Sequence, residues 1–572
     1  MVPTPTSSNP PTQLEIFFVA NNSTSPSHFV QTTLPTEIVS TLQTSTPIKL
    51  NELALALHDH PDKPFVASIL LDISRGVDLG FTGNRSARQT PNAKSSLKHK
   101  DIVSKAVMKE VKLGHTIGPF SEPPFLNFVT NSLGIRPKKT GGHRLIMDLS
   151  QPTNNSVNDF IPKENYTLVY ARIDDAIAMI NKHGPGSLLA KVDIQHAFRL
   201  CPVRKQDWHL LGFKWDGHYY FDRVLPFGLR SAPFLFNRIA TALEWVVRHQ
   251  AKTSDIIHYL DDFLAVGPPN HQSCQRSKDI ILNTCSTLGI PVAANKVEGP
   301  SSIITFLGVE LDTVDMVIRL PADKLENILS AIPLWANRYH CSKRELLSLI
   351  GTLSFACKCV PAGRLFLRRM IDLATTASSI NQIIVLSNDF RLDLQWWWEF
   401  LPNWNGSARI LATSWCLTPN MNLYTDASSV IACGAFYNKQ WFTLPWSPDK
   451  CSINPPLSIE WKELFPILIS CLIWGHLWHG QKIMFHCDNE AIVNIWKKGT
   501  SRCQRIMSLV RAIFFTAANG NFHVMIAHIR GTNNSIADSL SRLQMKRFRQ
   551  LVPDAATEPV TLPDLDSYYP QQ

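Results

Sequence analysis

Short apolar runs separated by polar turns fill the middle of the chain, and they predict buried strands. Residues 256–257 and 263–266 form two such runs, and Asp261 and Asp262 lie in the turn between them. A third run, over 187–192, leads directly into Asp193. Because residues 121–315 mix strands of this kind with helical patterns, we expect an α+β region there.

Helical periodicity dominates residues 316–414, and the pattern changes again after residue 421. The new pattern runs through three strands, a long helix, a strand, two helices, a strand and a last helix. This order predicts one compact α/β domain over residues 415–545. The expected helices lie at 324–336, 342–358, 363–374, 455–478, 490–497, 501–518 and 535–543, and the later strands at 482–488 and 522–529.

The two ends of the chain have a different composition from the middle. Residues 1–46 are rich in Ser, Thr, Pro and Asn, and residues 546–572 are acidic and rich in Pro, so both are expected to be disordered. Residues 47–120 show helical patterns interrupted by a basic stretch. The start lacks the pattern of a signal peptide, and the longest apolar stretch, 464–478, is short for a membrane span. We therefore expect an intracellular protein, cytoplasmic or nuclear, that does not bind a membrane.

The formal net charge of +10 over 572 residues favours a polyanionic partner. The chemistry of the acidic residues gives a sharper prediction. An Asp pair can simply reflect the preference of Asp for turns. Three carboxylates on neighbouring strand ends, however, can hold two Mg²⁺ ions, because Mg²⁺ prefers oxygen ligands. Asp193, Asp261 and Asp262 fit the second interpretation.

The order of the motifs around these acids resembles that of retroelement reverse transcriptases. The matching segments are Arg144 to Leu149, Asp193 to Phe198, Leu225 to Pro233, Tyr259 to Asp262, Lys296 and Phe306 to Gly308. The resemblance implies a right-hand polymerase with fingers and palm over 121–315 and a thumb or connection over 316–414.

The resemblance also implies a role for each matching residue. Asp193, Asp261 and Asp262 would bind metal, and Arg144 would hold the incoming triphosphate. The ring of Phe198 would exclude a 2′-hydroxyl and so select deoxynucleotides. The nucleotide-binding set is completed by Phe227, Gly228 and Lys296. Taken singly, these residues can also be a core ring, a turn glycine or surface cations.

A second acidic set lies in the last domain and resembles that of the ribonuclease H of retroelements. It consists of Asp426, Glu463, Asp488 and Asp538, which would bind a second pair of metal ions. Glu460 remains an alternative to Glu463. Thr532 stands where cellular enzymes of this fold often carry a histidine.

Further segments resemble DIRS-type retrotransposons, among them Pro123 to Phe125, Arg136 to Lys139 and Ser156 to Asp159. The implied protein is an RNA- and DNA-templated DNA polymerase with ribonuclease H activity, with two Mg²⁺ or Mn²⁺ ions per site. Its implied partners are an RNA template, a DNA primer, RNA–DNA hybrid, deoxynucleoside triphosphates, and a separate tyrosine recombinase and capsid-like protein. The alternatives are a decayed or domesticated protein that only binds nucleic acid, and an interaction protein on an inactive scaffold.

Overall fold

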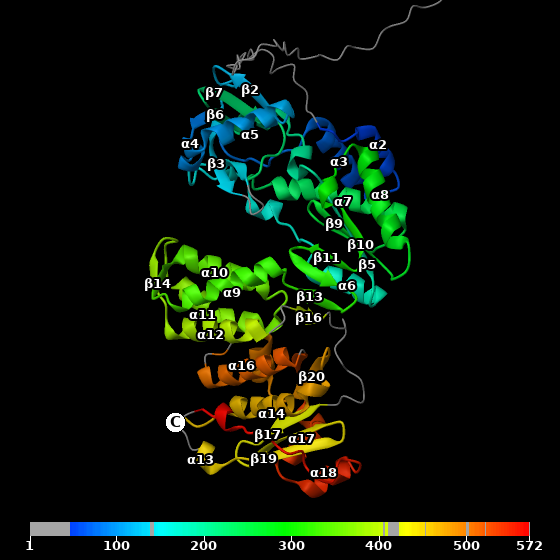
Figure 1. The fold of residues 1–572 in the computed structure, drawn as a ribbon, viewed down its shortest axis with the longest axis vertical. Coiled ribbons are helices and arrows are strands. Elements are labelled where there is room, and N and C mark those ends of the chain that lie inside the picture. The colour runs from blue at the N-terminus through cyan, green and yellow to red at the C-terminus, as the bar shows by residue number, and fades with distance from the viewer. Residues whose placement is uncertain are drawn as a thin grey trace, which may run out of the picture. The chain divides into compact units, whose positions relative to one another are not determined.

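The computed structural model describes residues 46–570 except 138–141, 404–406, 410–422, 452–453, 499–500, 502 and 521. The described residues divide into two compact units (Figure 1). The first unit contains residues 81–160 and 203–229. The second contains residues 46–80, 161–202 and 230–570.

Within the described part of the first unit, six strands form one sheet in the order β1-β3-β6-β7-β2, with β4 paired to β3. Helices α4 and α5 pack against it. Strand β3 is the longest and pairs antiparallel with β4, so that Arg136 lies opposite Arg144. The elements are β1 Arg88–Gln89, α4 Lys94–Lys98, α5 Lys100–Lys112, β2 Thr116–Phe120, β3 Val129–Pro137, β4 His143–Asp148, β6 Gly212–Trp215 and β7 His218–Asp222.

The second unit begins with a sheet of order β10-β5-β9-β8. Strand β9 is buried from Phe263 through Gly267, which explains its continuous apolar sequence. Helices α6 and α8 cover this sheet, and α7 packs against α8 and β8. The elements are α2 Leu50–Ala56, α3 Lys63–Arg75, α6 Ile173–His183, β5 Leu188–Asp193, α7 Ala232–Ala251, β8 Ile256–Tyr259, β9 Asp262–Gly267, α8 Ser273–Leu288 and β10 Glu298–Ser301.

A mostly helical region follows, as the periodicity predicts. Helix α10 begins with a capping box, in which the Ser342 side chain accepts from the Glu345 amide and Glu345 bonds back to the Ser342 amide. The elements are β11 Ile303–Phe306, β12 Val309–Asp312, β13 Val317–Arg319, α9 Ala322–Ala336, β14 His340–Ser342, α10 Lys343–Ala356, α11 Arg368–Thr375, β15 Ile383–Val385, α12 Asn388–Asn403 and β16 Ser407–Arg409.

The last part contains a mixed sheet of order β19-β18-β17-β20-β21 (Figure 1). Its two faces are covered by different helices. Cys433 and Ala435 of β18 pack into the cluster that includes α14, while Phe436 packs beside Leu540 and Phe548 of α17 and α18. The elements are β17 Tyr424–Ala427, β18 Ala432–Tyr437, β19 Gln440–Pro445, α13 Pro448–Cys451, α14 Ile459–Trp474, β20 Lys482–Cys487, α15 Glu490–Lys498, α16 Gln504–Asn519, β21 His523–His528, α17 Ser535–Ser541 and α18 Met545–Leu551.

The C-terminal segment differs from the expectation of a disordered tail over 546–572. Helix α18 follows α17, and the chain then runs beside β19, where the Ala556 and Val560 amides donate to the carbonyls of Lys439 and Trp441. Near the end, Tyr569 packs on aromatic rings of α14. Scattered apolar residues within an acidic, Pro-rich composition anchor this segment, and composition alone does not reveal them.

Two other expected boundaries also differ from the structure. The expected helical region 47–120 and the expected region 121–315 each divide between the two compact units. The expectation for residues 1–45 lies outside the described residues.

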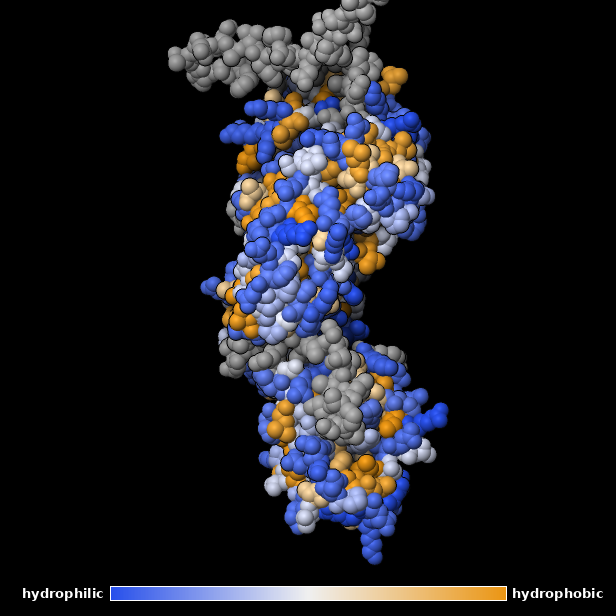
Figure 2. All heavy atoms as spheres, turned by 90° about the vertical axis from the view of Figure 1, so that its right-hand side faces the viewer, coloured by the Kyte–Doolittle hydropathy of each residue, from blue (hydrophilic) through white to orange (hydrophobic). Residues whose placement is uncertain are grey.

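The face drawn in Figure 2 shows separate hydrophobic patches among hydrophilic residues. Exposed apolar side chains scattered in this way are ordinary at a protein surface. Within the described residues, none of the helices combines the length and the apolar character that crossing a bilayer requires.

Candidate active sites

The first acidic set converges where β5 meets β9. These strands are antiparallel, and Asp193 at the end of β5 lies directly opposite Asp262 at the start of β9. Asp261 occupies the turn before β9, and its carbonyl accepts a 2.9 Å hydrogen bond from the Ile194 amide. Leu260 in the same turn has a φ of +53°, a left-handed conformation that is uncommon for a leucine. The fold thus brings Asp193 beside an acid pair that lies far from it in the sequence.

Burial and mutual repulsion make it unfavourable to hold these three carboxylates together without a cation. Asp193 is only 5% exposed. Burial raises the pKa of Asp262 to about 6, and the nearby charges of Asp261 and Asp193 act in the same direction. A divalent cation relieves such repulsion, and carboxylate oxygens are the ligands that Mg²⁺ prefers. The donor set therefore fits the expected metal.

Lys296 reaches the same acids from the segment before β10. Its Nζ lies 2.8 Å from Asp193 Oδ2, while its side chain remains 56% exposed. The hydrogen bond to Asp193 raises the pKa of this lysine. Lys296 therefore supplies positive charge at the edge of the acidic set.

Phe198 follows Asp193 in a short 3-10 helix, Ala197–Leu200. Its half-buried ring meets Phe236 of α7 edge to face, with 5.8 Å between the ring centroids. This contact fixes the ring a few residues beyond Asp193.

The other expected nucleotide-binding residues belong to the first unit. The exposed guanidinium of Arg144 lies 5.4 Å from the ring centroid of Phe227. Gly228 has a φ of +105°, and a Cβ placed there would come within 2.8 Å of the Met147 carbonyl oxygen. The backbone conformation and this close approach thus favour a glycine at position 228, in addition to its expected place in the nucleotide-binding set.

Arg136 is a further candidate for nucleotide binding, to which the sequence analysis assigns no such role. It lies directly opposite Arg144 on β3, and both side chains are exposed. Like charges facing each other across a strand pair are unfavourable unless an anion lies between them. The segment that begins at Arg136 resembles a retroelement motif, but only the register of β3 and β4 shows that Arg136 lies opposite Arg144.

The second acidic set gathers at the carboxyl ends of β17 and β20, two neighbouring strands inside the last sheet. Parallel β17 and β20 pair at Tyr424 and His486, so Asp426 and Asp488 follow at matching positions. Glu463 projects from α14, and its carboxylate, the Cys487 thiol and the Asp488 carboxylate offer ligand atoms within 4.8 Å of one another. This proximity favours Glu463 over Glu460 as the helix acid.

The two buried acids of this set, Asp426 and Glu463, have raised pKa values. Burial raises the pKa of Glu463 to about 9, and the charges of Asp426 and Asp488 contribute to the rise. Burial also raises the pKa of Asp426 to about 6, against a hydrogen bond from Ser541. Oxygen donors that repel one another in this way fit a pair of Mg²⁺ ions.

Sequence reasoning did not assign roles to three neighbours of these acids. The Asn534 amide lies 3.4 Å from Asp426 Oδ1, and the Ser541 hydroxyl donates to Asp426 Oδ2. The Cys487 thiol lies 3.9 Å from Glu463 Oε2. Asn534, Ser541 and Cys487 lie within a few residues of Asp538 or Asp488 in the sequence, but only the fold reveals which acid each one contacts.

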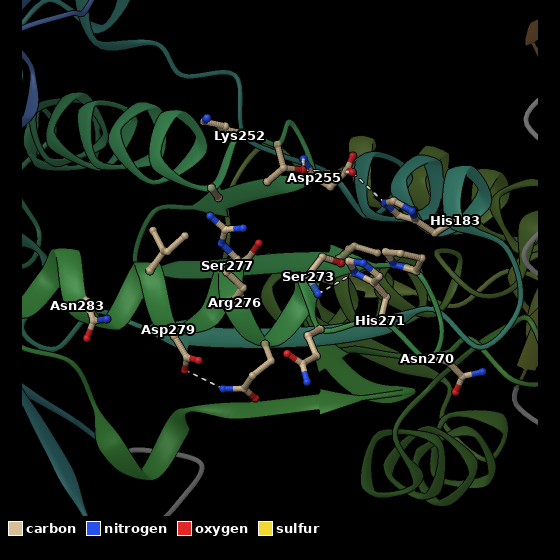
Figure 3. A pocket seen from close by; sticks show the side chains of 17 residues that line it. His183, Lys252, Asp255, Asn270, His271, Ser273, Arg276, Ser277, Asp279 and Asn283 are labelled. Carbon is tan, nitrogen blue, oxygen red and sulfur yellow. Dashed lines mark hydrogen bonds and ion pairs between the residues drawn. The ribbon is translucent and has the colours of Figure 1, made fainter.

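A pocket of about 970 Å³ lies elsewhere in the second unit, between the end of α7 and the start of α8 (Figure 3). None of the seven acids lines it. Its own acids are already paired: Asp255 binds Lys182 and His183, and Asp279 accepts from Gln275. In Figure 3 the side chains of His183 and Asp255 point toward each other. The pocket therefore does not offer an open metal site.

Comparison with known proteins supports an interpretation of the segment that holds the first site. Residues 136–311 match the family model described as reverse transcriptase (RNA-dependent DNA polymerase). This segment is a reverse transcriptase domain. The match includes Arg144, Asp193 and the Asp261–Asp262 pair. The second acidic set lies beyond the matched residues, so this comparison leaves it unassigned.

Curated relatives of the chain are transposon polyproteins. The chain is 23% identical over 426 residues to the Transposon Tf2-3 polyprotein of Schizosaccharomyces pombe, and 22% identical to the Tf2-7 polyprotein. The alignment covers 71% of this chain but only 28% of either polyprotein.

The chain also aligns with solved structures of a viral protein. A foamy viral protease-reverse transcriptase in complex with double-stranded DNA aligns at 16% identity with a TM-score of 0.47, over 88% of this chain and 84% of that one. The same viral protein in complex with RNA/DNA hybrid aligns at 13% identity with a TM-score of 0.42, over 90% and 87%. The expected α+β and α/β class is confirmed by the arrangement of helices and sheets, and the polymerase part of the expected fold by the reverse transcriptase match.

Proposed function

We propose that this chain is a reverse transcriptase with an associated ribonuclease H, acting in the replication of a retrotransposon. One observation carries the proposal. Asp193 and Asp262 are directly opposed across β5 and β9, with Asp261 beside them, inside the segment that matches reverse transcriptases.

For DNA synthesis, Asp193, Asp261 and Asp262 would hold two Mg²⁺ or Mn²⁺ ions. When bound, such ions lower the pKa of the primer 3′-hydroxyl and neutralise the leaving pyrophosphate. The guanidinium groups of Arg144 and Arg136 would pair with triphosphate oxygens. The Phe198 ring would occupy the space that a ribonucleotide 2′-hydroxyl needs.

For strand cleavage, Asp426, Glu463, Asp488 and Asp538 would hold the second pair of ions. The Asn534 and Ser541 contacts keep the Asp426 carboxylate oriented. Gly531 lets its loop lie close to Asp488, since a Cβ there would come within 3.2 Å of Asp488 Oδ2. The substrate would be the RNA strand of an RNA–DNA hybrid.

The proposed substrates are an RNA or DNA template, a DNA primer and deoxynucleoside triphosphates, handled inside the cell. Nucleic acid would be held mainly through its phosphates and helical shape. The resemblance to DIRS-type elements supports a separate tyrosine recombinase and a capsid-like protein as partners.

A two-part assay tests this function. Purified protein should extend a DNA primer on an RNA template, and should cleave the RNA of a labelled hybrid, only when Mg²⁺ or Mn²⁺ is added. Binding of the hybrid with neither reaction would favour a decayed protein that only binds nucleic acid. Absence of binding would favour an interaction protein on an inactive scaffold.

A further inference from the structure

The carboxylate of Asp538 is held on both sides by arginines. Arg542 Nε lies 2.6 Å from Asp538 Oδ1, and Arg547 Nη1 lies 2.8 Å from Asp538 Oδ2. Asp538 is 24% exposed, whereas the side chains of Arg542 and Arg547 are 53% and 45% exposed. Both guanidinium groups thus reach the surface beside the second acidic set.

Helix α18 brings Arg547 to this position. The next residue, Phe548, is fully buried and packs on Trp441 and Phe436 with ring centroids 5.3 Å and 6.1 Å apart. Arg549 also secures the helix, because its guanidinium donates to the carbonyls of Ala555 and Thr557. The arginine contact with Asp538 is therefore built on an anchored element.

This arrangement conflicts with the proposed role of Asp538. Two guanidinium groups at these distances compete with a metal ion for the carboxylate, because they occupy acceptor sites on both oxygens and repel a nearby cation. When the carboxylate turns to a cation, the two guanidinium groups lose their ion-pair partner at the rim of the site, and Arg547 keeps its hydrogen bond to Gln544. Guanidinium forks match phosphate oxygens well, and the substrate of this site is a phosphodiester backbone.

We propose that Arg542 and Arg547 form a binding site for backbone phosphates of the hybrid, which Asp538 covers until a metal ion takes its carboxylate. The inference rests on the proposed ribonuclease H function. In the free protein the two arginines pair with Asp538, and during cleavage they pair with phosphates of the substrate.

Metal binding without nucleic acid is the first test. The full chain carries Asp261→Asn and Asp262→Asn to weaken the polymerase site, and Mn²⁺ binding is followed by electron paramagnetic resonance. Adding Arg542→Gln and Arg547→Gln should tighten Mn²⁺ binding about 5- to 10-fold, because two guanidinium groups no longer compete with the ion for the Asp538 carboxylate. Lys546→Gln removes an exposed charge from the same helix and should change the binding much less.

Hybrid binding is the second test. The double arginine variant should raise the KM for hybrid cleavage about tenfold and make the dependence of log affinity on log salt shallower by about one to two. The Mg²⁺ concentration for half-maximal cleavage should fall in the same variant. Lys439→Gln is the control, because that lysine pairs with Asp554, 3.1 Å away, rather than with any of the four acids.

Opposite movements of metal and hybrid affinity distinguish this role from a structural one, since misfolding would weaken both. Unchanged or weaker Mn²⁺ binding, or an unchanged KM and salt dependence, would overturn the inference. A wild-type chain that cleaves no hybrid would overturn the proposed ribonuclease H instead. In that case Mn²⁺ binding, and hybrid affinity measured by fluorescence anisotropy, still decide whether the arginines exchange partners.

Discussion

Asp488 lies one residue beyond the end of β20. Its carboxylate and that of Glu463 offer ligand atoms within 4.8 Å of each other. Asp488→Asn keeps the shape but removes a negative charge that the proposed metal pair requires. Hybrid cleavage should fall at least about 100-fold, because each 1.36 kcal/mol of lost transition-state stabilisation costs a factor of ten.

DNA synthesis by the Asp488→Asn protein should stay within about twofold of wild type, because the two acidic sets are separate. Glu490→Gln serves as the matched control, since this exposed acid lies two residues further on. Wild-type cleavage by the Asp488→Asn protein would remove Asp488 from the site.

At position 198, the size of the ring carries the expected selectivity. Phe198→Ala opens space beside Asp193, so ribonucleotide incorporation should rise at least about tenfold relative to deoxynucleotide incorporation. Single-nucleotide kinetics with each triphosphate measures this ratio. Phe198→Tyr keeps the bulk and should keep the discrimination. An unchanged ratio in the alanine variant would mean that Phe198 acts only through its packing on Phe236.

At the scale of elements, a buried acid links two groups of helices. Asp393 of α12 is 0% exposed, with Arg369 of α11 at 3.5 Å and Arg511 of α16 at 3.7 Å. Burial nevertheless raises the pKa of Asp393 to about 6 from an ordinary value of 3.8. The folded state therefore binds this proton more tightly than the unfolded state does.

The sign of the resulting pH dependence follows from linkage. The contribution of Asp393 to the free energy of unfolding should fall as pH rises from about 4 to about 6, by at most about 3 kcal/mol, and be constant above that range. Urea unfolding of wild type and Asp393→Asn across this range, followed by tryptophan fluorescence, measures the difference between the two proteins.

Asp389→Asn is the control for this series, because its side chain lies on the same helix but is 55% exposed. A stability difference between wild type and Asp393→Asn that does not change with pH would contradict the assignment.

Helix α18 gives a second prediction at this scale. Phe548→Ala removes a fully buried ring between Phe436 and Trp441 and should destabilise the last domain by about 3 to 5 kcal/mol. Limited trypsin digestion should then cut near Arg547 and Arg549 faster than in wild type. Equal digestion rates would show that the packing of this ring contributes little to holding the helix.

Periodicity and turn residues were enough to predict the order of elements in the last domain and the hairpin that carries Asp261 and Asp262. The C-terminal segment could not be predicted in the same way. Its anchors, such as Phe548 and Tyr569, are single apolar residues in a polar composition, and their packing depends on surfaces made by distant strands.

The acids of both sites could be proposed from their motifs, but their surroundings could not. That Arg136 faces Arg144 depends on strand register, and that Arg547 reaches Asp538 depends on the placement of a helix. Such contacts join residues through the fold, so spacing along the chain carries little information about them.

At the scale of the whole molecule, two chemically similar sites are built from different elements. One uses the end of β5 and the start of β9, which are antiparallel. The other uses the carboxyl ends of β17 and β20 together with α14 and α17. Synthesis and cleavage should therefore be separable by single substitutions, while the same divalent ion supports both.

Primer extension by the Asp261→Asn protein, measured beside hybrid cleavage in the same preparation, tests the central claim most directly. Mg²⁺-dependent extension on an RNA template should fall at least about 100-fold relative to wild type, because the substitution removes one of the three clustered carboxylates. Hybrid cleavage should remain within about twofold. Extension at the wild-type rate would contradict the assignment of the polymerase site to Asp193, Asp261 and Asp262.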